Sequence, residues 1–365
     1  MTDPDRFRVP ILIVSFRNPG DVCACLNALS RSIIEPGFEI FVCENGGTDS
    51  FNELCNALLS PEGPCTMAFS SGLPSSLSTV SGRLGDVRCL ALRGRSSRVW
   101  IGCATQNLGY AGGINVWIDQ LLSIKGWQGI WILNPDSEPE PGALKALVDR
   151  SISGNKGMVG STILPSGSRN YVHCRGGHHW LKFKTNSRSI GFEEPVDAPI
   201  NLPAIEDALD CVSGASMYVT RACLEKIGPM DERFFLYYED ADWSMRARRY
   251  GLGYAPDSIV RHTGGTTIGS ARLRAQRSQL SVYLESRNRI HFVRMYWWPF
   301  LPLAYAVGLA YAATYLFARS PSNFNAALSG LVAAMKGETG PPARPVAGPQ
   351  PHLRSSSRQS ALKWW

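Results

Sequence analysis

Short apolar runs that alternate with helical segments are the feature that most constrains the fold of this 365-residue chain. Four runs typical of buried strands lie at residues 9–15, 38–43, 99–103 and 129–133. Residues 21–29 and 113–124 have apolar side chains at helical spacing, and another helix is expected after Pro141. Parallel strands need such crossover helices. The order therefore predicts an α/β protein with a mainly parallel, mixed sheet flanked by helices.

The second half of the chain carries weaker signals of the same kind. A strand is expected at residues 211–219 and a helix at residues 239–250, so this half is expected to complete the sheet. Residues 60–85 are rich in Ser, Gly and Pro without periodicity, and we predict a loop insertion there. A hydrophobic fraction of 44% with only 18% charged residues excludes a largely disordered chain. We therefore expect one globular domain over residues 1–295.

A hydrophobic helical region is expected to follow at residues 296–337. Its first part, residues 296–317, carries no charge and is long enough to cross a bilayer core at about 1.5 Å per residue. Such a segment can span a membrane, lie on its surface or cover the preceding domain, and the sequence leaves these alternatives open. Residues 323–335 add an amphipathic stripe, and we predict membrane association. Residues 338–365 are rich in Pro, Ser and Arg, which predicts a disordered basic tail.

The charges and the first residues indicate a location. The first seven residues are polar and lack the apolar core of a signal peptide, so we expect this domain in the cytoplasm. Arg287, Arg289 and Arg294 precede the apolar run, and positive residues favour the cytoplasmic side. We therefore expect the protein at the cytoplasmic face of the membrane. No nucleic-acid partner is expected despite the net charge of +7, because the basic residues form no stripe interleaved with aromatic ones.

Polar residues follow the predicted strands at the edge where open α/β sheets bind ligands. Glu44 and Asn45 follow the second run in a turn-forming segment, and Asp136 follows the fourth. Hard oxygen ligands suit Mg²⁺ or Mn²⁺, so Asp136 is a candidate metal ligand, with capping of the next turn as the alternative. His262 is a candidate second ligand, although a lone histidine is more often structural.

A glycine-rich segment precedes the helix expected at residues 113–124. It contains Asn107, Gly109, Gly112, Gly113 and Asn115. Glycines before a helix let the backbone approach a ligand and let amides face an anion such as a diphosphate. The alternative is that the glycines make only a turn.

Acidic and aromatic residues crowd together before residue 250. Glu239 and Asp240 begin the predicted helix and arginines end it, an order that the helix dipole alone would favour. The dipole does not explain the four aromatic residues just upstream, Phe234, Phe235, Tyr237 and Tyr238. Aromatic side chains desolvate a neighbouring carboxylate and raise its basicity. This segment therefore indicates a general base beside a platform for a sugar.

Taken in this order, the motifs resemble glycosyltransferase family 2, especially its rhamnosyltransferase-like members of bacterial cell-surface polysaccharide synthesis. The resemblance covers about residues 9–294 and adds Ser15, Phe16 and Asn134 to the residues above. It implies a GT-A fold, in which a Rossmann-like sheet holds the nucleotide of a dTDP- or UDP-sugar and the later half of the domain shapes the acceptor site.

The resemblance also implies the roles of individual residues. Donor-binding residues would be Ser15, Phe16, Glu44, Asn45, Asn107, Gly109, Gly112, Gly113, Asn115, Asn134 and Asp136. Asp136 and His262 would meet the metal, Mg²⁺ or Mn²⁺. Asp240, paired with Glu239, matches the catalytic base.

Tyr238 and Trp243 would contact the acceptor, a hydroxyl of a lipid-linked glycan or of an oligosaccharide, and the implied displacement inverts the configuration of the sugar. Two positions depart from the family pattern. Glu44 stands where aspartate is commoner, and Asn-Pro-Asp at residues 134–136 replaces a motif with two aspartates.

Two other functions compete with this one. A sugar-phosphate nucleotidyltransferase would carry a basic, glycine-rich loop after the first strand, whereas residues 15–20 offer one arginine and one glycine. A catalytically degenerate scaffold that binds a nucleotide sugar without turnover would be consistent with the altered metal motif, but not with the retention of Asp136, Asp240 and His262.

Overall fold

A computed structural model describes residues 8–68, 82–167, 170–264, 274–344 and 346. Within these residues, eleven strands form one sheet. Across the sheet the order is β3 (Cys65–Met67), β4 (Leu84–Leu92), β5 (Arg98–Ala104), β2 (Gly37–Glu44), β1 (Arg8–Ser15), β6 (Gly129–Leu133), β13 (Ser216–Thr220), β8 (Met158–Pro165), β14 (Leu252–His262) and β7 (Ser137–Pro139). The remaining strand, β9 (Cys174–Arg175), pairs with β8.

The sheet is mixed and its centre is parallel, as the sequence predicts. Strands β5, β2, β1 and β6 are parallel neighbours, and β8 is parallel to β14. Strand β13 runs antiparallel to both β6 and β8. The carboxyl ends of β1, β2, β5, β6, β8 and β14 therefore meet at one edge of the sheet, and the segment that enters β13 lies at the same edge.

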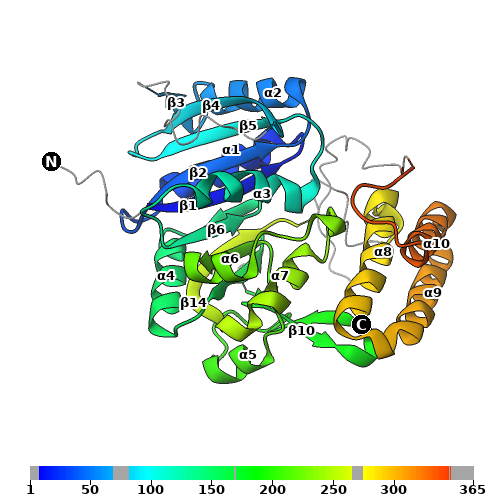
Figure 1. The fold of residues 1–365 in the computed structure, drawn as a ribbon. Coiled ribbons are helices and arrows are strands. Elements are labelled where there is room, and N and C mark those ends of the chain that lie inside the picture. Colours follow the sequence, from blue (N-terminus) through cyan, green and yellow to red (C-terminus); the bar gives the residue numbers. More distant parts are fainter. Residues whose placement is uncertain (1–7, 69–81, 168–169, 265–273, 345, 347–365) are drawn as a thin grey trace.

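Helices cover both faces of this sheet (Figure 1). Strand β1 alternates, with Val9, Ile11 and Ile13 in one core and Leu12 and Val14 in the other. The first core includes α1 (Pro19–Ser30), α2 (Thr48–Leu59) and α4 (Ala143–Ser153). The second includes α3 (Gly109–Leu122), α6 (Arg221–Ile227) and α7 (Glu239–Ala247). Because both faces are covered, the central strands are apolar throughout, which explains why they read as continuous apolar runs.

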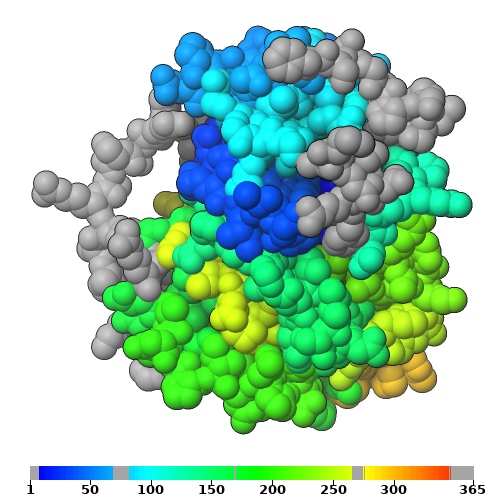
Figure 2. Space-filling view, turned by 90° about the vertical axis from the view of Figure 1, so that its left-hand side faces the viewer, coloured from blue at the N-terminus to red at the C-terminus, as the bar shows by residue number. Residues whose placement is uncertain are grey.

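The two parts of the chain form one body. Figure 2 shows the N-terminal strands and helices stacked directly on the later part of the chain. A small second sheet of β11 (Asn186–Ser189), β10 (Gly177–Leu181) and β12 (Cys211–Val212) lies beside the main one, and α5 (Leu202–Ala208) lies next to it.

Several predicted boundaries are wrong. The strand expected at residues 211–219 is two strands, β12 and β13, because residues 213–215 leave one sheet to enter the other. The helix expected at residues 113–124 already begins at Gly109. The helix expected at residues 239–250 ends at Ala247 and continues as a short 3-10 turn. The loop predicted at residues 60–85 contains β3 and the start of β4, and residues 69–81 lie outside the described part of the chain.

Three C-terminal helices pack against one another beside the sheet. They are α8 (Gln279–Tyr296), α9 (Leu301–Phe317) and α10 (Pro321–Met335). The segment Trp298–Phe317 is long and apolar enough to cross a membrane, and only 22% of its most hydrophobic window is buried. Glu338, the first residue of the predicted disordered tail, instead contacts α8: the Tyr283 hydroxyl donates to its side chain, and His291 is hydrogen-bonded to its carbonyl.

Candidate active site

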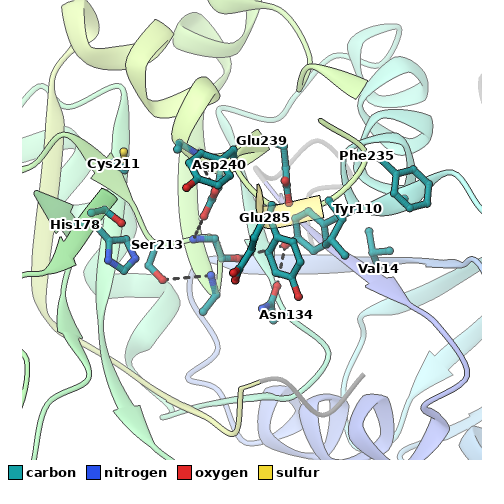
Figure 3. Close-up of a pocket in the computed structure, with 18 of the residues that line it drawn as sticks. Val14, Tyr110, Asn134, His178, Cys211, Ser213, Phe235, Glu239, Asp240 and Glu285 are labelled. Atoms are coloured by element: carbon teal, nitrogen blue, oxygen red, sulfur yellow. Dashed lines mark hydrogen bonds between the residues drawn. The ribbon is translucent and has the colours of Figure 1, made fainter. Parts of the chain in front are cut away.

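A cavity of about 610 Å³ lies at the edge where the parallel strands end (Figure 3). Its first wall comes from the strand ends and the segment that enters β13. Side chains of this wall include Phe16, Asn45, Asn107, Asn134, Asp136 and His262. Its second wall comes from residues 235–241 and from α8 and α9. The fold therefore places sequence-distant motifs around one space.

Asp136 and His262 lie side by side in the first wall. Strand register explains this, because His262 pairs with Ser137, the neighbour of Asp136. His262 Nε2 is 3.1 Å from Asp136 Oδ1 and 3.3 Å from Asn134 Nδ2. The backbone N–H of Gly264 donates to Asp136 Oδ2 at 3.0 Å. The structure thus brings together the two residues that the sequence singled out as metal ligands.

Asp136 and His262 offer the kinds of ligand atom that suit a metal ion bound partly by the protein and partly by a substrate. Within the described residues no three His, Cys, Asp or Glu side chains gather as a metal site. Mg²⁺ typically takes one or two carboxylates from a protein and completes its shell with water and substrate phosphates. Asp136 and His262 at a cavity wall fit this way of binding. They do not fit a closed site in which the protein supplies every metal ligand.

Glu239 and Asp240 begin α7 and project into the same cavity (Figure 3). Asp240 accepts hydrogen bonds from two backbone N–H groups, Gly214 to Oδ2 at 3.2 Å and Ala241 to Oδ1 at 2.8 Å. Glu239 is buried, and its Oε2 has no hydrogen-bond partner within the described residues. The two acids therefore have different surroundings although they are adjacent in sequence.

These surroundings separate the acid–base properties of the pair. Desolvation raises the pKa of Glu239 well above its ordinary value, and the negative charge of Asp240 raises it further. Desolvation also raises the pKa of Asp240, but the N–H groups of Ala241 and Gly214 oppose that shift. Hydrogen bonds to a carboxylate favour its ionised form. When the pair holds one proton, the proton belongs on Glu239 and the charge on Asp240.

The loop before these acids has an unusual backbone. Phe235, Tyr237 and Tyr238 have φ values of 62°, 68° and 76°, a region that non-glycine residues rarely adopt. Asn288 on α8 holds this loop: its Nδ2 lies 2.8 to 2.9 Å from the carbonyl oxygens of Phe234, Leu236 and Tyr237. Sequence reasoning missed Asn288. The available signal was a polar residue on the buried face of a helix.

Ser15 and Glu44 do not line the cavity, although their neighbours Phe16 and Asn45 do. Strand register places them opposite each other, and both are almost fully buried. Ser15 Oγ donates to Glu44 Oε2, while the backbone N–H groups of Arg17 and Gly46 donate to Glu44 Oε1. The expectation that they contact the nucleotide directly is not met by this arrangement. They fix the two loops that present Phe16 and Asn45 to the cavity.

The glycine-rich segment plays a different part from the one predicted. Asn107 and Gly109 line the cavity, but Gly112, Gly113 and Asn115 do not. The N–H of Gly109 donates to Asn107 Oδ1, and the N–H of Tyr110 donates to the Phe235 carbonyl, so these amides have partners within the protein.

Close packing explains the glycines. A Cβ at Gly113 would lie 2.9 Å from the Val14 side chain, and one at Gly109 would lie 2.3 Å from the Phe235 carbonyl oxygen. The Asn115 side chain donates to the Met230 carbonyl and accepts from the Met230 N–H. The segment packs α3 against β1 and against the chain before α7, and the predicted amide cradle for a diphosphate is wrong at these positions.

Of the two predicted acceptor residues, only Tyr238 lines the cavity. Trp243 is fully buried in the core between α7 and the sheet, and its indole N–H donates to the Gly228 carbonyl at 2.8 Å. The assignment of Trp243 to the acceptor is therefore wrong, because α7 turns that side chain away from the cavity. Aromatic residues that sequence reasoning missed, Tyr110, Trp180 and Tyr311, line the cavity instead.

In sequence, the chain is similar to glycosyltransferases. No family model matches it. It is 28% identical over 186 residues to a low-salt glycan biosynthesis hexosyltransferase of Haloferax volcanii, a match that covers 50% of this chain and 56% of that protein. It is 26% identical over 205 residues to an N-acetylglucosaminyl-diphospho-decaprenol L-rhamnosyltransferase of Mycobacterium tuberculosis, covering 50% of this chain and 65% of that protein. The chain thus matches less than two thirds of the length of these relatives.

Two solved structures are distantly similar. One is S. aureus TarS in complex with UDP-GlcNAc, at 11% identity and a TM-score of 0.46, covering 91% of this chain and 93% of that one. The other is a mannosyltransferase of Pyrobaculum calidifontis in complex with GDP-Man and Mn²⁺, at 15% identity and a TM-score of 0.46, covering 91% of this chain and 88% of that one.

Proposed function

We propose that this protein is an inverting glycosyltransferase of family 2 with a GT-A fold. It moves a sugar from a nucleotide-sugar donor to a hydroxyl of a lipid-linked glycan acceptor in cell-surface polysaccharide synthesis. The observation that carries the proposal is a single cavity with the Asp136–His262 pair in one wall and the Glu239–Asp240 pair facing it. The printed activities of the sequence relatives, a hexosyltransferase and a rhamnosyltransferase, support the same class.

Asp240 is the base in this proposal. A base must be ionised before it can accept the proton of the acceptor hydroxyl, and the two N–H groups at Asp240 favour its ionised form. Glu239 holds the proton of the pair and keeps a second negative charge out of the cavity. As Asp240 takes the proton, the acceptor oxygen attacks the anomeric carbon from the side opposite the leaving diphosphate. One displacement of this kind inverts the configuration.

The donor lies along the wall formed by the strand ends. Phe16, Asn45, Asn107 and Asn134 offer an aromatic face and amide groups to a nucleotide and its sugar. Asp136 and His262 would hold Mg²⁺ or Mn²⁺, which when bound neutralises charge on a diphosphate leaving group. The donor class is a dTDP- or UDP-sugar, and rhamnose is favoured by the printed activity of the mycobacterial relative.

Donor binding gives the first test. A ligand that binds the folded state raises apparent stability by mass action, about 2.7 kcal/mol at a hundred times its Kd. In a panel of dTDP-, UDP- and GDP-sugars, we expect a dTDP- or UDP-sugar to raise the melting temperature in the presence of Mn²⁺, and Asp136→Asn to abolish the Mn²⁺-dependent part of that rise. Glu138→Gln, an exposed neighbour of Asp136, is the matched control. If no nucleotide sugar shifts the wild-type melting temperature with or without metal, the proposed function is wrong.

A membrane at the cytoplasmic face is the second part of the proposal. Only 22% of the most hydrophobic window of the segment Trp298–Phe317 is buried, which argues against the alternative that α9 is a core helix. Its outward side chains include Leu309, Leu316 and Phe317, with exposed fractions of 53%, 50% and 88%. The exposed Phe183 lies beside the turn before α9, with its ring 5.4 Å from that of Phe300. Exposed Lys182 and Lys184 flank Phe183 and suit an anionic lipid surface.

Flotation with phosphatidylglycerol-containing vesicles tests this part. Fully burying a Leu or Phe side chain contributes about 1.5–3 kcal/mol, so replacing Leu309, Leu316 and Phe317 together by serine is expected to weaken vesicle binding at least tenfold. Replacing Ile33 and Ile34, which are exposed near the end of α1, is the control and should leave binding unchanged. Equal binding by the wild type and the triple variant would exclude α9 as the membrane contact.

A further inference from the structure

The helical wall of the cavity carries two buried guanidinium groups. Among the described residues that line the cavity, Arg277 and Arg289 are the only arginines, and no lysine lines it. Arg277 lies just before α8, and Arg289 lies in the middle of that helix. Arg289 is 8% exposed, and the side chain of Arg277 is 10% exposed. Both charges are therefore held away from bulk water.

One carboxylate compensates these two charges. Glu285 forms an ion pair with Arg277 and lines the same cavity (Figure 3). Arg289 instead contacts neutral groups: its guanidinium lies 5.0 Å from the centre of the Tyr311 ring, and it hydrogen-bonds the Tyr238 hydroxyl. Within the described residues, the Nε atoms of both arginines are buried without a hydrogen-bond partner. Two buried guanidinium groups that share one carboxylate leave an excess positive charge, and a buried excess charge is costly, so the arrangement favours an anion bound from the cavity.

The positions of the arginines separate this anion from the donor diphosphate. The proposed donor side, Asp136 with His262, belongs to the strand ends, whereas Arg289 lies on α8 and Arg277 just before it. Arg289 is held by Tyr238, the residue directly before the two acids. Because the donor occupies the strand ends, the acceptor must reach Asp240 from the opposite wall, which is formed by the C-terminal helices. The anion that fits this wall is therefore part of the acceptor.

Helix α9 connects the same wall to the apolar surface. Tyr311 lines the cavity, while Leu309 and Leu316 on the same helix are exposed. An acceptor with a phosphorylated head and an apolar chain matches both features, because its head can enter the cavity while its chain lies along α9. Guanidinium groups bind phosphate oxygens through paired, charge-assisted hydrogen bonds, which a lysine does not reproduce.

We propose that Arg289, assisted by Arg277, binds the phosphate that joins the acceptor sugar to its lipid. This inference rests on the proposed function and deepens it, since it assigns the acceptor a phosphorylated lipid head and names the residues that recognise it. The binding of the head positions the acceptor hydroxyl near Asp240.

The test compares two probes that differ only in the head group. Geranylgeranyl diphosphate and geranylgeraniol are titrated into the full-length protein in detergent, and their affinities are measured by calorimetry. We expect the wild type to bind the diphosphate more tightly. In Arg289→Met, loss of a charged hydrogen-bonding partner should weaken diphosphate binding about ten- to hundredfold and leave alcohol binding unchanged.

Two further variants keep the result interpretable. Arg294→Met removes a positive charge from the exposed side of α8 and should leave the affinities of both probes unchanged. Arg289→Lys keeps the charge but loses the fork geometry, and should weaken diphosphate binding several-fold even if the methionine variant does not fold. The proposal would be overturned if both Arg289 variants kept the wild-type ratio of diphosphate affinity to alcohol affinity.

Nucleotide affinity shows whether the arginines bind the phosphate of the acceptor or the diphosphate of the donor. The affinity for UDP and dTDP should be the same in the wild type and in Arg289→Met. A tenfold loss of nucleotide affinity in the variant would place Arg289 in the donor site and overturn the acceptor assignment. Failure of the proposed function would appear differently, as the absence of nucleotide-sugar binding by the wild type. That outcome would not change the ratio of the affinities for the two lipid probes.

Discussion

Asp240→Asn is expected to lower the rate of sugar transfer by about 10²–10⁴-fold, the usual contribution of a positioned general base. The amide has nearly the shape of the carboxylate, so the cavity is preserved, but it cannot accept the acceptor proton. Donor affinity should change little, because the proposed donor groups lie in the other wall. The measurement is kcat with saturating donor and acceptor, beside donor affinity by calorimetry. Wild-type turnover in this variant would exclude Asp240 as the base.

Glu239→Gln is the matched control for that variant. In our account Glu239 holds a proton, because burial and the charge of Asp240 raise its pKa well above the ordinary value. A neutral amide replaces a neutral acid, so the loss of transfer should be far smaller than in Asp240→Asn. The opposite ranking of the two variants would move the base to Glu239.

The pH dependence follows from the same pair. Burial raises the pKa of Asp240, and the base works only when it is ionised. The transfer rate should therefore fall as the pH drops through this raised pKa. The acidic limb of the pH–rate profile should lie at a higher pH than the range in which an ordinary aspartate titrates. The acidic limb should disappear in Asp240→Asn.

Asn288→Asp is expected to reduce transfer on the order of 10²-fold, although Asn288 lies outside the cavity lining. The side chain keeps its size but loses the N–H donors that hold the carbonyl groups of Phe234, Leu236 and Tyr237. The loop between them is in a costly left-handed conformation and precedes both acids, and a misplacement of about 1 Å can cost a factor of that size.

Stability and activity together distinguish this effect from simple unfolding. Leaving buried carbonyl groups unpaired costs about 1–3 kcal/mol, so the variant should unfold at a lower urea concentration. At temperatures where it is fully folded, kcat should still be low and donor affinity near that of the wild type. A folded Asn288→Asp variant with wild-type kcat would show that the loop does not depend on this anchor.

The parts of the fold that follow from local pattern were predictable. Strands buried on both faces, such as β1, β2 and β6, read as apolar runs because the helices on each side leave no polar face. The carboxyl ends of these strands share one edge, which is why Asn45, Asp136 and His262 could be predicted at one site from their order alone.

The parts that depend on contacts distant in sequence were not predictable. Gly109 and Gly113 look like a phosphate-binding segment, but the Phe235 carbonyl and the Val14 side chain are the reason that no Cβ fits there. Trp243 follows the two acids at a spacing that places it on the core side of α7, and only the packing shows which side faces the sheet. Asn288 lies about fifty residues from the loop that it holds, so no local signal pairs the two.

The second wall of the cavity was hidden for the same reason. The sequence indicated a hydrophobic region after residue 296, but not that Tyr311 from that region would share a cavity with the acids of α7. The packing of α8 and α9 beside residues 235–241 makes this connection, and it makes a region predicted to associate with a membrane part of the site.

The most direct test of the central claim is transfer itself. Purified protein is incubated with Mn²⁺, a panel of dTDP-, UDP- and GDP-sugars and a prenyl-diphosphate-linked N-acetylglucosamine acceptor, and the product is analysed by mass spectrometry and NMR. We predict that the wild type adds one sugar with inverted anomeric configuration and that Asp240→Asn forms almost no product. A product with retained configuration, or no transfer from any donor in the panel, would contradict the account.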